Sequence, residues 1–165
     1  LAESATAPNE TDDELLYSGQ CRSRNAKEFD SPAGVNWRFR VPAGRVISFE
    51  DLNLGAQQFH AGRDFGDFLI WRRDDVPAYQ LAVVVDDAAM LVTEVVRGAD
   101  LLKSTARQIL LANALSLRIP AYYHCELVRD GQGRRLAKRH DSLSIRHLRE
   151  KGWSAEQVRE ATNPP

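Results

Sequence analysis

The stretch that most constrains the fold runs from Tyr79 to Ala112 and reads YQLAVVVDDAAMLVTEVVRGADLLKSTARQILLA. Within it, Leu91–Val96 is apolar and rich in β-branched residues, which predicts a mostly buried strand. An amphipathic pattern at helical spacing follows, and Pro120 ends the expected helix. Ala121–Val128 then predicts another strand. A strand, a helix and a strand in this order form the unit of a parallel sheet.

The expected helix begins near Ser104 and has one apolar stripe. The stripe consists of Ala106, Ile109, Leu110, Ala114 and Leu117. Lys103, Arg107 and Gln108 lie off that stripe, as on the polar face of an amphipathic helix. The earlier segment Leu81–Asp87 is ambiguous. Its three consecutive valines favour a strand, whereas AVVVDDAAM also fits a short buried helix.

The first third of the chain predicts loose structure followed by strands. Residues 1–14 are polar and acidic without a period, so we expect a disordered or loosely held start. Val35–Val41 alternates between apolar and polar residues, which predicts a strand with one buried face. After a Pro-Ala-Gly turn, Val46–Phe49 is expected to return as the second strand of a hairpin. Gln57–Asp67, with two glycines, predicts a loop, and Phe68–Arg72 predicts a strand.

The end of the chain predicts two short helices, Leu143–Lys151 and Ser154–Ala161. Gly152 separates them, and Ser154 is a natural N-cap. Just before them, Arg134–His140 reads RRLAKRH and predicts a short, flexible, cationic loop. An apolar α/β core followed by such a loop suits a protein that handles a polyphosphate.

Composition sets few further bounds. The length of 165 residues fits one domain with a proper core. The net charge of −1 produces no global attraction to nucleic acid, although residues 129–149 hold seven Lys or Arg against two Asp. Cys21 and Cys125 form no disulfide framework, and we expect neither a signal peptide nor a membrane-spanning segment. The cytoplasm, with reduced thiols, is therefore the expected compartment.

The central stretch closely resembles the second half of the catalytic domain of glutamyl-type class I aminoacyl-tRNA synthetases. The tail RLAKRHDSLSIRHLREKGWSAEQVR looks most like the short paralogues of that group, the glutamyl-Q tRNA(Asp) synthetases. The resemblance covers roughly Leu15 to Glu160 and is most specific over Asp64–His140. It implies that Leu81–Met90 is a helix. It also implies an α/β fold, the C-terminal half of a Rossmann-like catalytic domain with a small β-rich inserted region on its N-terminal side.

The resemblance implies three parts of the chain. Residues 1–14 are the loose start, and residues 15–56 are a remnant of the connecting, zinc-type insertion with a β-hairpin. Residues 57–165 are the second half of the catalytic domain, with the lysine loop and the two C-terminal helices. Half of a Rossmann-like sheet is expected to leave an unpaired strand edge. The first residue is Leu1 rather than Met, so we expect a processed chain, a recombinant piece or a fragment.

By the same resemblance, the basic loop is the mobile lysine loop that binds ATP. Lys138 aligns with the second lysine of the family's motif, Arg135 stands where the first usually is, and Ala137 replaces a serine. Arg139 completes the expected ATP-binding set. A mobile ammonium can meet the charge that develops on the pyrophosphate leaving group, since it binds most strongly in the transition state. The alternative is a solvated basic loop.

Tyr79 and Arg97 are, by resemblance, residues of the amino-acid pocket that contact glutamate. An arginine at the end of a buried strand can offer a bidentate fork to a carboxylate, and the carboxyl ends of strands are where α/β sheets bind ligands. The alternative for Arg97 is a structural ion pair with Asp100 or Glu94. The alternative for Tyr79 is a core aromatic whose hydroxyl meets a backbone carbonyl.

Tyr17 and Cys21 match the Tyr-x3-Cys half of the zinc site found in many glutamyl-Q enzymes. The Cys-x-Cys half is absent from this sequence, and two ligands cannot fill the four positions of a structural zinc. We therefore expect no tightly bound zinc here, although the full-length parent could hold one. Cys21 is expected to be a small, partly buried hydrophobe.

The function implied by the resemblance is that of an ATP-dependent ligase, or part of one. It would activate glutamate as the adenylate, with ATP and Mg²⁺, and transfer it to tRNA, in particular to queuosine of tRNA(Asp). Arg38 and Arg40 could meet tRNA phosphates or could be solvated strand-face charges.

Two alternatives remain open. The chain could be a glutamyl-tRNA synthetase cut off before its anticodon domain, or a non-catalytic remnant that binds tRNA or a partner. The HIGH loop of class I synthetases is absent from this sequence, so the chain alone is expected to be inactive. Its own missing N-terminal half is then an expected partner.

Overall fold

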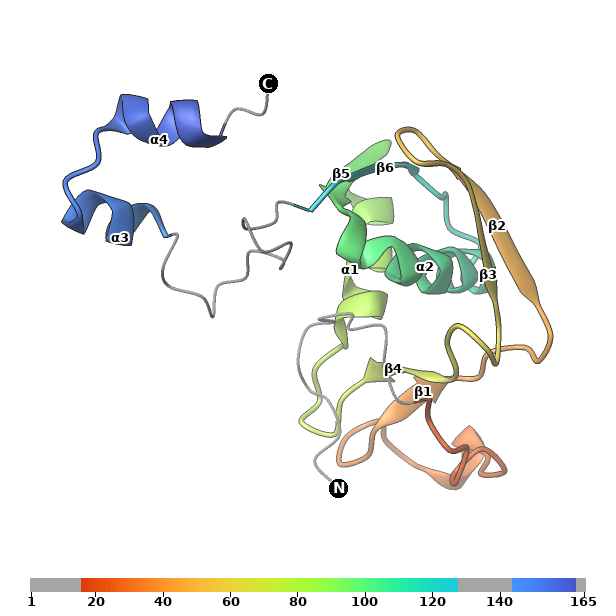
Figure 1. Ribbon diagram of the computed structural model, residues 1–165. Helices are drawn as coiled ribbons and strands as arrows, with labels where there is room; N and C mark the ends of the chain where they lie inside the picture. The colour runs from red at the N-terminus through yellow and green to blue at the C-terminus, as the bar shows by residue number, and fades with distance from the viewer. Residues whose placement is uncertain (1–15, 128–143, 163–165) are drawn as a thin grey trace. The chain divides into compact units, whose positions relative to one another are not determined.

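The computed structural model describes residues 16–127 and 144–162 (Figure 1). The contacts divide the chain into two compact units, one up to residue 126 and one from residue 127. The first unit is a mixed α/β structure, which confirms the predicted fold class. Its strands are β1 (Trp37–Phe39), β2 (Val46–Asp51), β3 (Gly55–His60), β4 (Phe68–Trp71), β5 (Glu94–Gly98) and β6 (Ala121–Cys125). Its helices are α1 (Tyr79–Ala89) and α2 (Leu102–Ala114), with short 3₁₀ helices η1 (Ala26–Glu28) and η2 (Ala99–Leu101).

The main sheet has four strands in the order β3-β2-β6-β5. β5 and β6 are parallel neighbours with α2 between them in the chain, which confirms the predicted strand–helix–strand unit. β2 also runs parallel to β6, with Asp51 beside Tyr122, while β3 is antiparallel to β2. Among the described residues, β5 is one edge of this sheet, and Val96 on it is 61% exposed. The prediction of a mostly buried strand over Leu91–Val96 was therefore wrong, because the strand begins at Glu94 and lies at the edge of the sheet.

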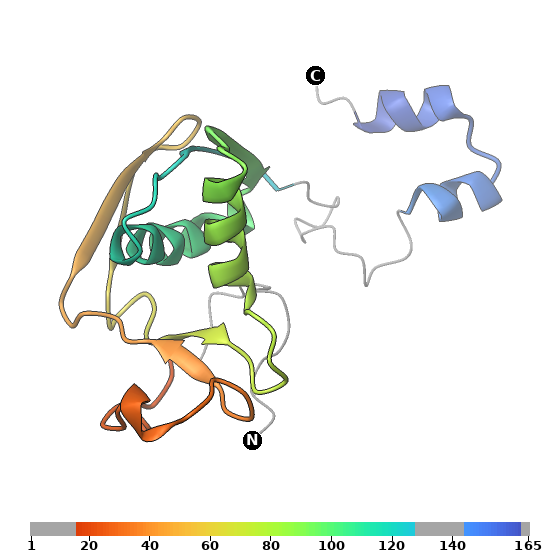
Figure 2. The same cartoon turned by 180° about the vertical axis from the view of Figure 1, so that it is seen from behind.

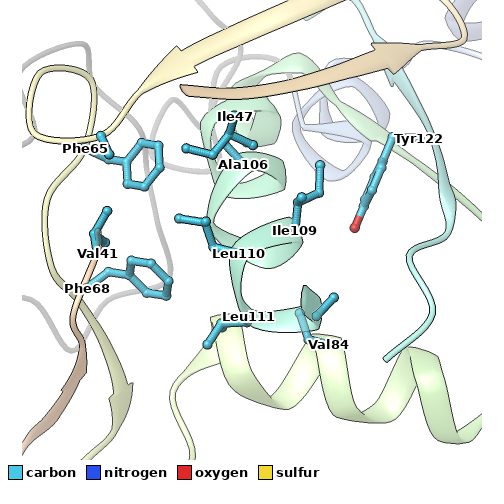
Figure 3. Close-up of a cluster of buried hydrophobic side chains, with 12 residues drawn as sticks. Val41, Ile47, Phe65, Phe68, Val84, Ala106, Ile109, Leu110, Leu111 and Tyr122 are labelled. Atoms are coloured by element: carbon cyan, nitrogen blue, oxygen red, sulfur yellow. The ribbon is translucent and has the colours of Figure 1, made fainter. Parts of the chain in front are cut away.

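Helix α2 lies at the centre of the core, and α1 lies across it (Figures 1 and 2). Ala106, Ile109 and Leu110 of α2 contribute buried apolar side chains that face the sheet and Phe65 (Figure 3). The residues from Ser104 to Ala112 are all buried, so the polar side of this helix packs inside the protein instead of facing solvent. The expected exposure of that side was wrong because the helix is enclosed by other elements.

Tyr79–Ala89 is helix α1, which confirms the helical alternative for the valine-rich segment. Gln80 and Val84 are its buried residues and lie one turn apart, so a single face of the helix packs inward. Tertiary packing thus outweighs the β propensity of three consecutive valines. α2 ends at Ala114, six residues before the expected stop at Pro120, and Ser116 follows with a φ of 55°.

The predicted hairpin of Asn36–Phe49 was wrong. β1 pairs with β4, and β2 pairs with β3, of which the part from Gln57 onward was expected to form a loop. The carboxylate of Asp51 accepts hydrogen bonds from the backbone N–H groups of Asn53 and Leu54, which turns the chain directly from β2 into β3. Alternation of apolar and polar residues identifies a half-buried strand but not the strand that pairs with it. β3 was not predicted as a strand because its glutamines are typical of a loop. Residue 57, the expected boundary between two parts, lies inside β3.

The second unit contains α3 (Ile145–Glu150) and α4 (Ala155–Thr162), so the two predicted helices are confirmed. Gly152 separates them with a φ of 83°, a conformation that favours glycine. Ser154 caps α4: its Oγ accepts a hydrogen bond from the N–H of Gln157, whose side chain accepts one from the N–H of Ser154. None of the described helices is long and apolar enough to span a bilayer.

Candidate functional site

Three parallel strands end with polar side chains on the same face of the sheet. On each strand the polar residue comes two positions after an apolar or aromatic residue. Side chains two positions apart in a strand point to the same face of the sheet. These polar residues are Asp51 of β2, His124 of β6 and Arg97 of β5. Arg97 and His124 are register partners. The carboxyl ends of parallel strands are the edge at which α/β sheets bind ligands, so this row is the candidate site.

Asp51 and His124 form the buried part of the row, and neither side chain is exposed. The Nδ1 atom of His124 lies 2.6 Å from Oδ2 of Asp51. Oδ1 of Asp51 accepts three backbone N–H groups, from Asn53, Leu54 and His124 itself. Burial alone would raise the pKa of Asp51, but the hydrogen bonds from the His124 side chain and from these N–H groups outweigh it and lower that pKa to about 2. Asp51 is therefore an ionised carboxylate.

Arg97 extends from the end of β5 and bonds to neutral groups. Its Nε donates to Nε2 of His124 at 3.1 Å. Its Nη2 donates to Oγ1 of Thr105 at 2.6 Å and to Oε1 of Gln108 at 2.8 Å, and lies 3.4 Å from the carbonyl oxygen of Leu101. Neither Glu94 nor Asp100 is among these recorded partners. Among the described residues no hydrogen bond is recorded for Nη1, so this nitrogen can bind a ligand.

This geometry corrects one expectation. The predicted bidentate fork requires two guanidinium nitrogens facing the same carboxylate. Nε and both hydrogens of Nη2 are engaged inside the protein, so Nη1 alone offers two N–H groups.

Tyr122 is buried, and its aromatic ring lies beside the guanidinium of Arg97. The guanidinium carbon of Arg97 lies 5.3 Å from the centre of the Tyr122 ring. Burial raises the pKa of Tyr122 to about 12; the charge of Arg97 opposes this rise, and Asp87 and Tyr79 add to it. Burial also raises the pKa of Asp87, against the charge of Arg97. Tyr79, Asp87 and Arg97 therefore act electrostatically on one region. Tyr79 is 37% exposed, which rules out the core-aromatic alternative.

A second polar chain runs from Arg97 into the packing between α1 and α2. Nε2 of Gln108 donates to Oε1 of Gln80 at 3.0 Å, and Nε2 of Gln80 donates to Oγ of Ser104 at 2.9 Å. All three side chains are buried. Their hydrogen bonds compensate for the loss of water around the polar groups.

The other predicted site residues lie elsewhere. Arg135, Lys138 and Arg139 fall outside the described residues. Tyr17 accepts a hydrogen bond from the backbone N–H of Cys21, and Cys21 is exposed, so the expectation of a partly buried thiol was wrong. A tight turn at this position leaves its side chain in solvent. No group of three His, Cys, Asp or Glu that could hold a metal ion occurs in residues 16–127 and 144–162.

Most of the polar row was missed from the sequence. None of Asp51, Gln80, Thr105 and His124 was predicted as a site residue. One feature of the sequence could have indicated this row. In each of the three parallel strands, the last side chain on the face toward the core is polar, which is unusual for a buried strand.

The family described as the catalytic domain of class I tRNA synthetases (E and Q) matches residues 2–162. A glutamyl-Q tRNA(Asp) synthetase of Nitratidesulfovibrio vulgaris is 48% identical over 161 residues, which cover 93% of this chain and 48% of that protein. A glutamate–tRNA ligase of Nitrosococcus oceani is 44% identical over 146 residues, covering 86% of this chain and 31% of its own length. The chain thus spans about half, or less, of these curated relatives.

A solved structure gives the same picture of the fold. A glutamate tRNA ligase from Elizabethkingia meningosepticum, crystallised in complex with its amino acid, matches with a TM-score of 0.58 and 29% sequence identity. The match covers 70% of this chain and 22% of that chain.

Proposed function

Since the chain belongs to the catalytic-domain family of class I tRNA synthetases (E and Q), we propose that it is part of an ATP-dependent ligase that activates glutamate and transfers it to tRNA. The activity is proposed for the whole protein, because the chain spans only 48% of the glutamyl-Q relative and 31% of the glutamate–tRNA ligase.

The observation that carries the proposal is the guanidinium of Arg97 at the carboxyl end of β5. Three of its five N–H groups bond to His124, Thr105 and Gln108, and the two on Nη1 remain for a ligand. A fixed cation with free donors suits a carboxylate, and glutamate carries two carboxylates. Tyr79, on the first turn of α1, is the proposed second contact with glutamate.

ATP is proposed to bind through Lys138, with Arg135 and Arg139 beside it. The ammonium of Lys138 would stabilise the phosphates as pyrophosphate leaves, and this assignment rests on the family resemblance of the loop. Mg²⁺ is expected to accompany ATP. The described residues supply no cluster of ligands for it, so we derive no step through the metal.

The proposed acceptor is queuosine of tRNA(Asp), as the names of the glutamyl-Q relatives indicate. The alternative acceptor is tRNA(Glu), since glutamate–tRNA ligases match nearly as well. Charging tRNA(Glu) and queuosine-containing tRNA(Asp) side by side distinguishes them. Further proposals are the cytoplasm as the compartment and the protein's own N-terminal half as a partner. A non-catalytic remnant that binds tRNA remains the alternative from another class.

Glutamate binding tests the proposal most directly. We expect millimolar glutamate to shift the ¹⁵N resonances of the Arg97 side chain in the 165-residue chain, and to shift them more than glutamine does. Arg97→Gln should weaken glutamate binding about tenfold or more, because a charge-assisted contact is lost. Arg118→Gln, the same change at an exposed arginine, is the matched control. Equal glutamate affinity in both variants would refute the role of Arg97.

A further inference from the structure

We propose that Asp51 and His124 are positioning residues that hold the guanidinium of Arg97 in one orientation, with Nη1 left for the ligand carboxylate. Neither residue has been assigned a role above beyond its place in the row. The inference rests on the proposed function only for the identity of the ligand. The hydrogen bonds that carry it are independent of that function.

The first step is the protonation state of His124. The Nε of arginine carries a hydrogen and can only donate, so Nε2 of His124 must accept the 3.1 Å hydrogen bond. Oγ1 of Thr105 lies 3.1 Å from the same nitrogen, and its hydroxyl can donate to it as well. An imidazole nitrogen that accepts carries no proton. The proton of the neutral ring is therefore on Nδ1, which donates to Oδ2 of Asp51 at 2.6 Å.

The second step is the reason that position 51 is a carboxylate. Oδ1 of Asp51 accepts three backbone N–H groups, and Oδ2 accepts the imidazole N–H. Both oxygens must therefore be acceptors. Only an ionised carboxylate provides this, and it selects the His124 tautomer that presents a lone pair to Arg97.

The third step concerns the opposite side of the guanidinium, where a chain of hydrogen bonds also fixes which atom faces Arg97. Ser104 Oγ accepts from Gln80, and Gln80 accepts from Gln108. This fixes the side-chain amide of Gln108 so that its oxygen faces Nη2 of Arg97 at 2.8 Å. Hydrogen bonds from two directions thus determine the rotation of one planar cation.

The arrangement predicts an unusual sensitivity to an isosteric change. In Asp51→Asn, the amide oxygen must face the three backbone N–H groups, so the amide nitrogen faces Nδ1 of His124. That ring nitrogen must then accept, and the proton moves to Nε2. Two donors, Nε2–H of His124 and Nε–H of Arg97, would face each other at 3.1 Å, and Nε2–H would have to turn to Oγ1 of Thr105, which also lies 3.1 Å away. The same substitution in serine-protease triads keeps the geometry and imposes the wrong tautomer.

Three variants of the 165-residue chain separate positioning from simple stability. Asp51→Asn should move the proton from Nδ1 to Nε2, as read from ¹⁵N shifts of the imidazole. His124→Gln places an amide near the position of Nε2, so it can still accept from Arg97 although it loses Asp51. His124→Asn places its amide near the position of Nδ1, so it keeps Asp51 and loses Arg97.

We expect a crossed result. Asp51→Asn and His124→Asn should broaden or shift the Nε–H resonance of Arg97 and weaken glutamate binding about tenfold or more. His124→Gln should keep that resonance and bind glutamate within about threefold of the wild type, despite the lower stability expected from an unpaired Asp51 oxygen. A purely structural role predicts instead that glutamate affinity follows stability in all three variants.

Each outcome decides the proposal. A wild-type imidazole protonated on Nε2 overturns it, as does an Asp51→Asn variant with wild-type Arg97 resonance and glutamate affinity. If the wild type shows the Nδ1 proton and a variant-sensitive Arg97 but binds no glutamate, the positioning holds and the proposed function fails.

Discussion

The two sides of α2 are equally buried but are built by different means. In the apolar core, Ala106 and Leu110 lie toward Ile47 and Phe65, and Ile109 lies toward Tyr122 (Figure 3). On the other side of the helix, Ser104, Thr105 and Gln108 face the polar row, and each takes part in a hydrogen bond there. Nine consecutive buried residues of one helix therefore contribute both to the apolar core and to the network of hydrogen bonds around Arg97.

The difference shows that, within one domain, one set of residues provides the stability of the fold and another set fixes the orientation of the Arg97 side chain. Apolar packing depends on volume and tolerates changes that conserve it. The polar network depends on matching every donor with an acceptor, so a change of one atom can reverse a hydrogen bond. We expect mutations on the apolar side to alter stability alone. Mutations on the polar side should alter ligand binding more than their stability cost suggests.

The largest effect is expected at the apolar side. Phe65 is fully buried, so Phe65→Ala should lower the free energy of unfolding by about 3–5 kcal/mol, through lost burial and the cavity that remains. Urea unfolding measures this loss, and Phe59→Ala, at a partly buried position, should cost less. At temperatures where the variant is folded, its glutamate affinity should match the wild type. A large loss of affinity in the folded variant would break the division between the two sides.

The pH dependence of stability tests the polar side. The pKa of Asp51 is about 2 in the folded protein, against 3.8 as its ordinary value. Because the folded pKa is the lower one, the carboxylate stabilises the fold fully above about pH 4, and this contribution is lost as the pH falls toward 2. The shift corresponds to about 2–3 kcal/mol. The unfolding free energy of the wild type, measured between pH 2 and 6, should show this decrease.

The control for that measurement is a pair of matched variants. Asp51→Asn should remove the pH-dependent contribution, and Asp30→Asn, at an exposed aspartate, should retain it. An unchanged pH dependence in Asp51→Asn would mean that Asp51 is not the group responsible.

A smaller effect is expected for Thr105→Val, which keeps the shape of the side chain but removes the hydroxyl. Nη2 of Arg97 then loses its 2.6 Å acceptor, and a hydrogen bond to a charged group contributes about 1.5–3 kcal/mol. Calorimetric titration with glutamate should show a weaker affinity together with this loss of stability. Unaltered affinity would show that Gln108 and His124 suffice to orient the guanidinium.

The smallest effect is expected one turn along the same helix. Ile109→Val removes one methylene from the apolar side and should cost about 0.5–1.5 kcal/mol, without any change in glutamate affinity. Thermal unfolding and glutamate titration of this variant, beside Thr105→Val, provide the sharpest form of the comparison. Equal effects of both variants on affinity would contradict it.

The sequence predicts the central architecture well. A β-branched run, a helical period and a further strand correctly indicate β5, α2 and β6, because the residue pattern within an element predicts its type. The burial of β5 and of the polar side of α2 was not predicted, since it depends on neighbouring elements. The strand pairing of the first third was not predictable in this way, since β1 finds its partner at β4, more than twenty residues away.

The candidate site was only partly predictable, for a similar reason. Arg97 stands out as a cation at the end of an apolar run, and it lies near the carboxyl end of β5, although that strand is an exposed edge and not the mostly buried strand that was predicted. The residues that hold it come from β2, α2 and β6, so no local pattern unites them. Gln108 resembled a surface residue because a polar side chain at a buried helical position depends on partners in another element.

The position of β6 has a consequence for how the protein assembles. This strand is the last of the first unit along the chain, yet it inserts between β2 and β5. Asp51 and His124 are 73 positions apart, so during synthesis the earlier strands leave the ribosome well before the strand that joins them. Closing such a long segment is entropically costly and slows folding. Until then the flanks of β2 and β5 are open to mispairing, a period in which chaperones are expected to matter most.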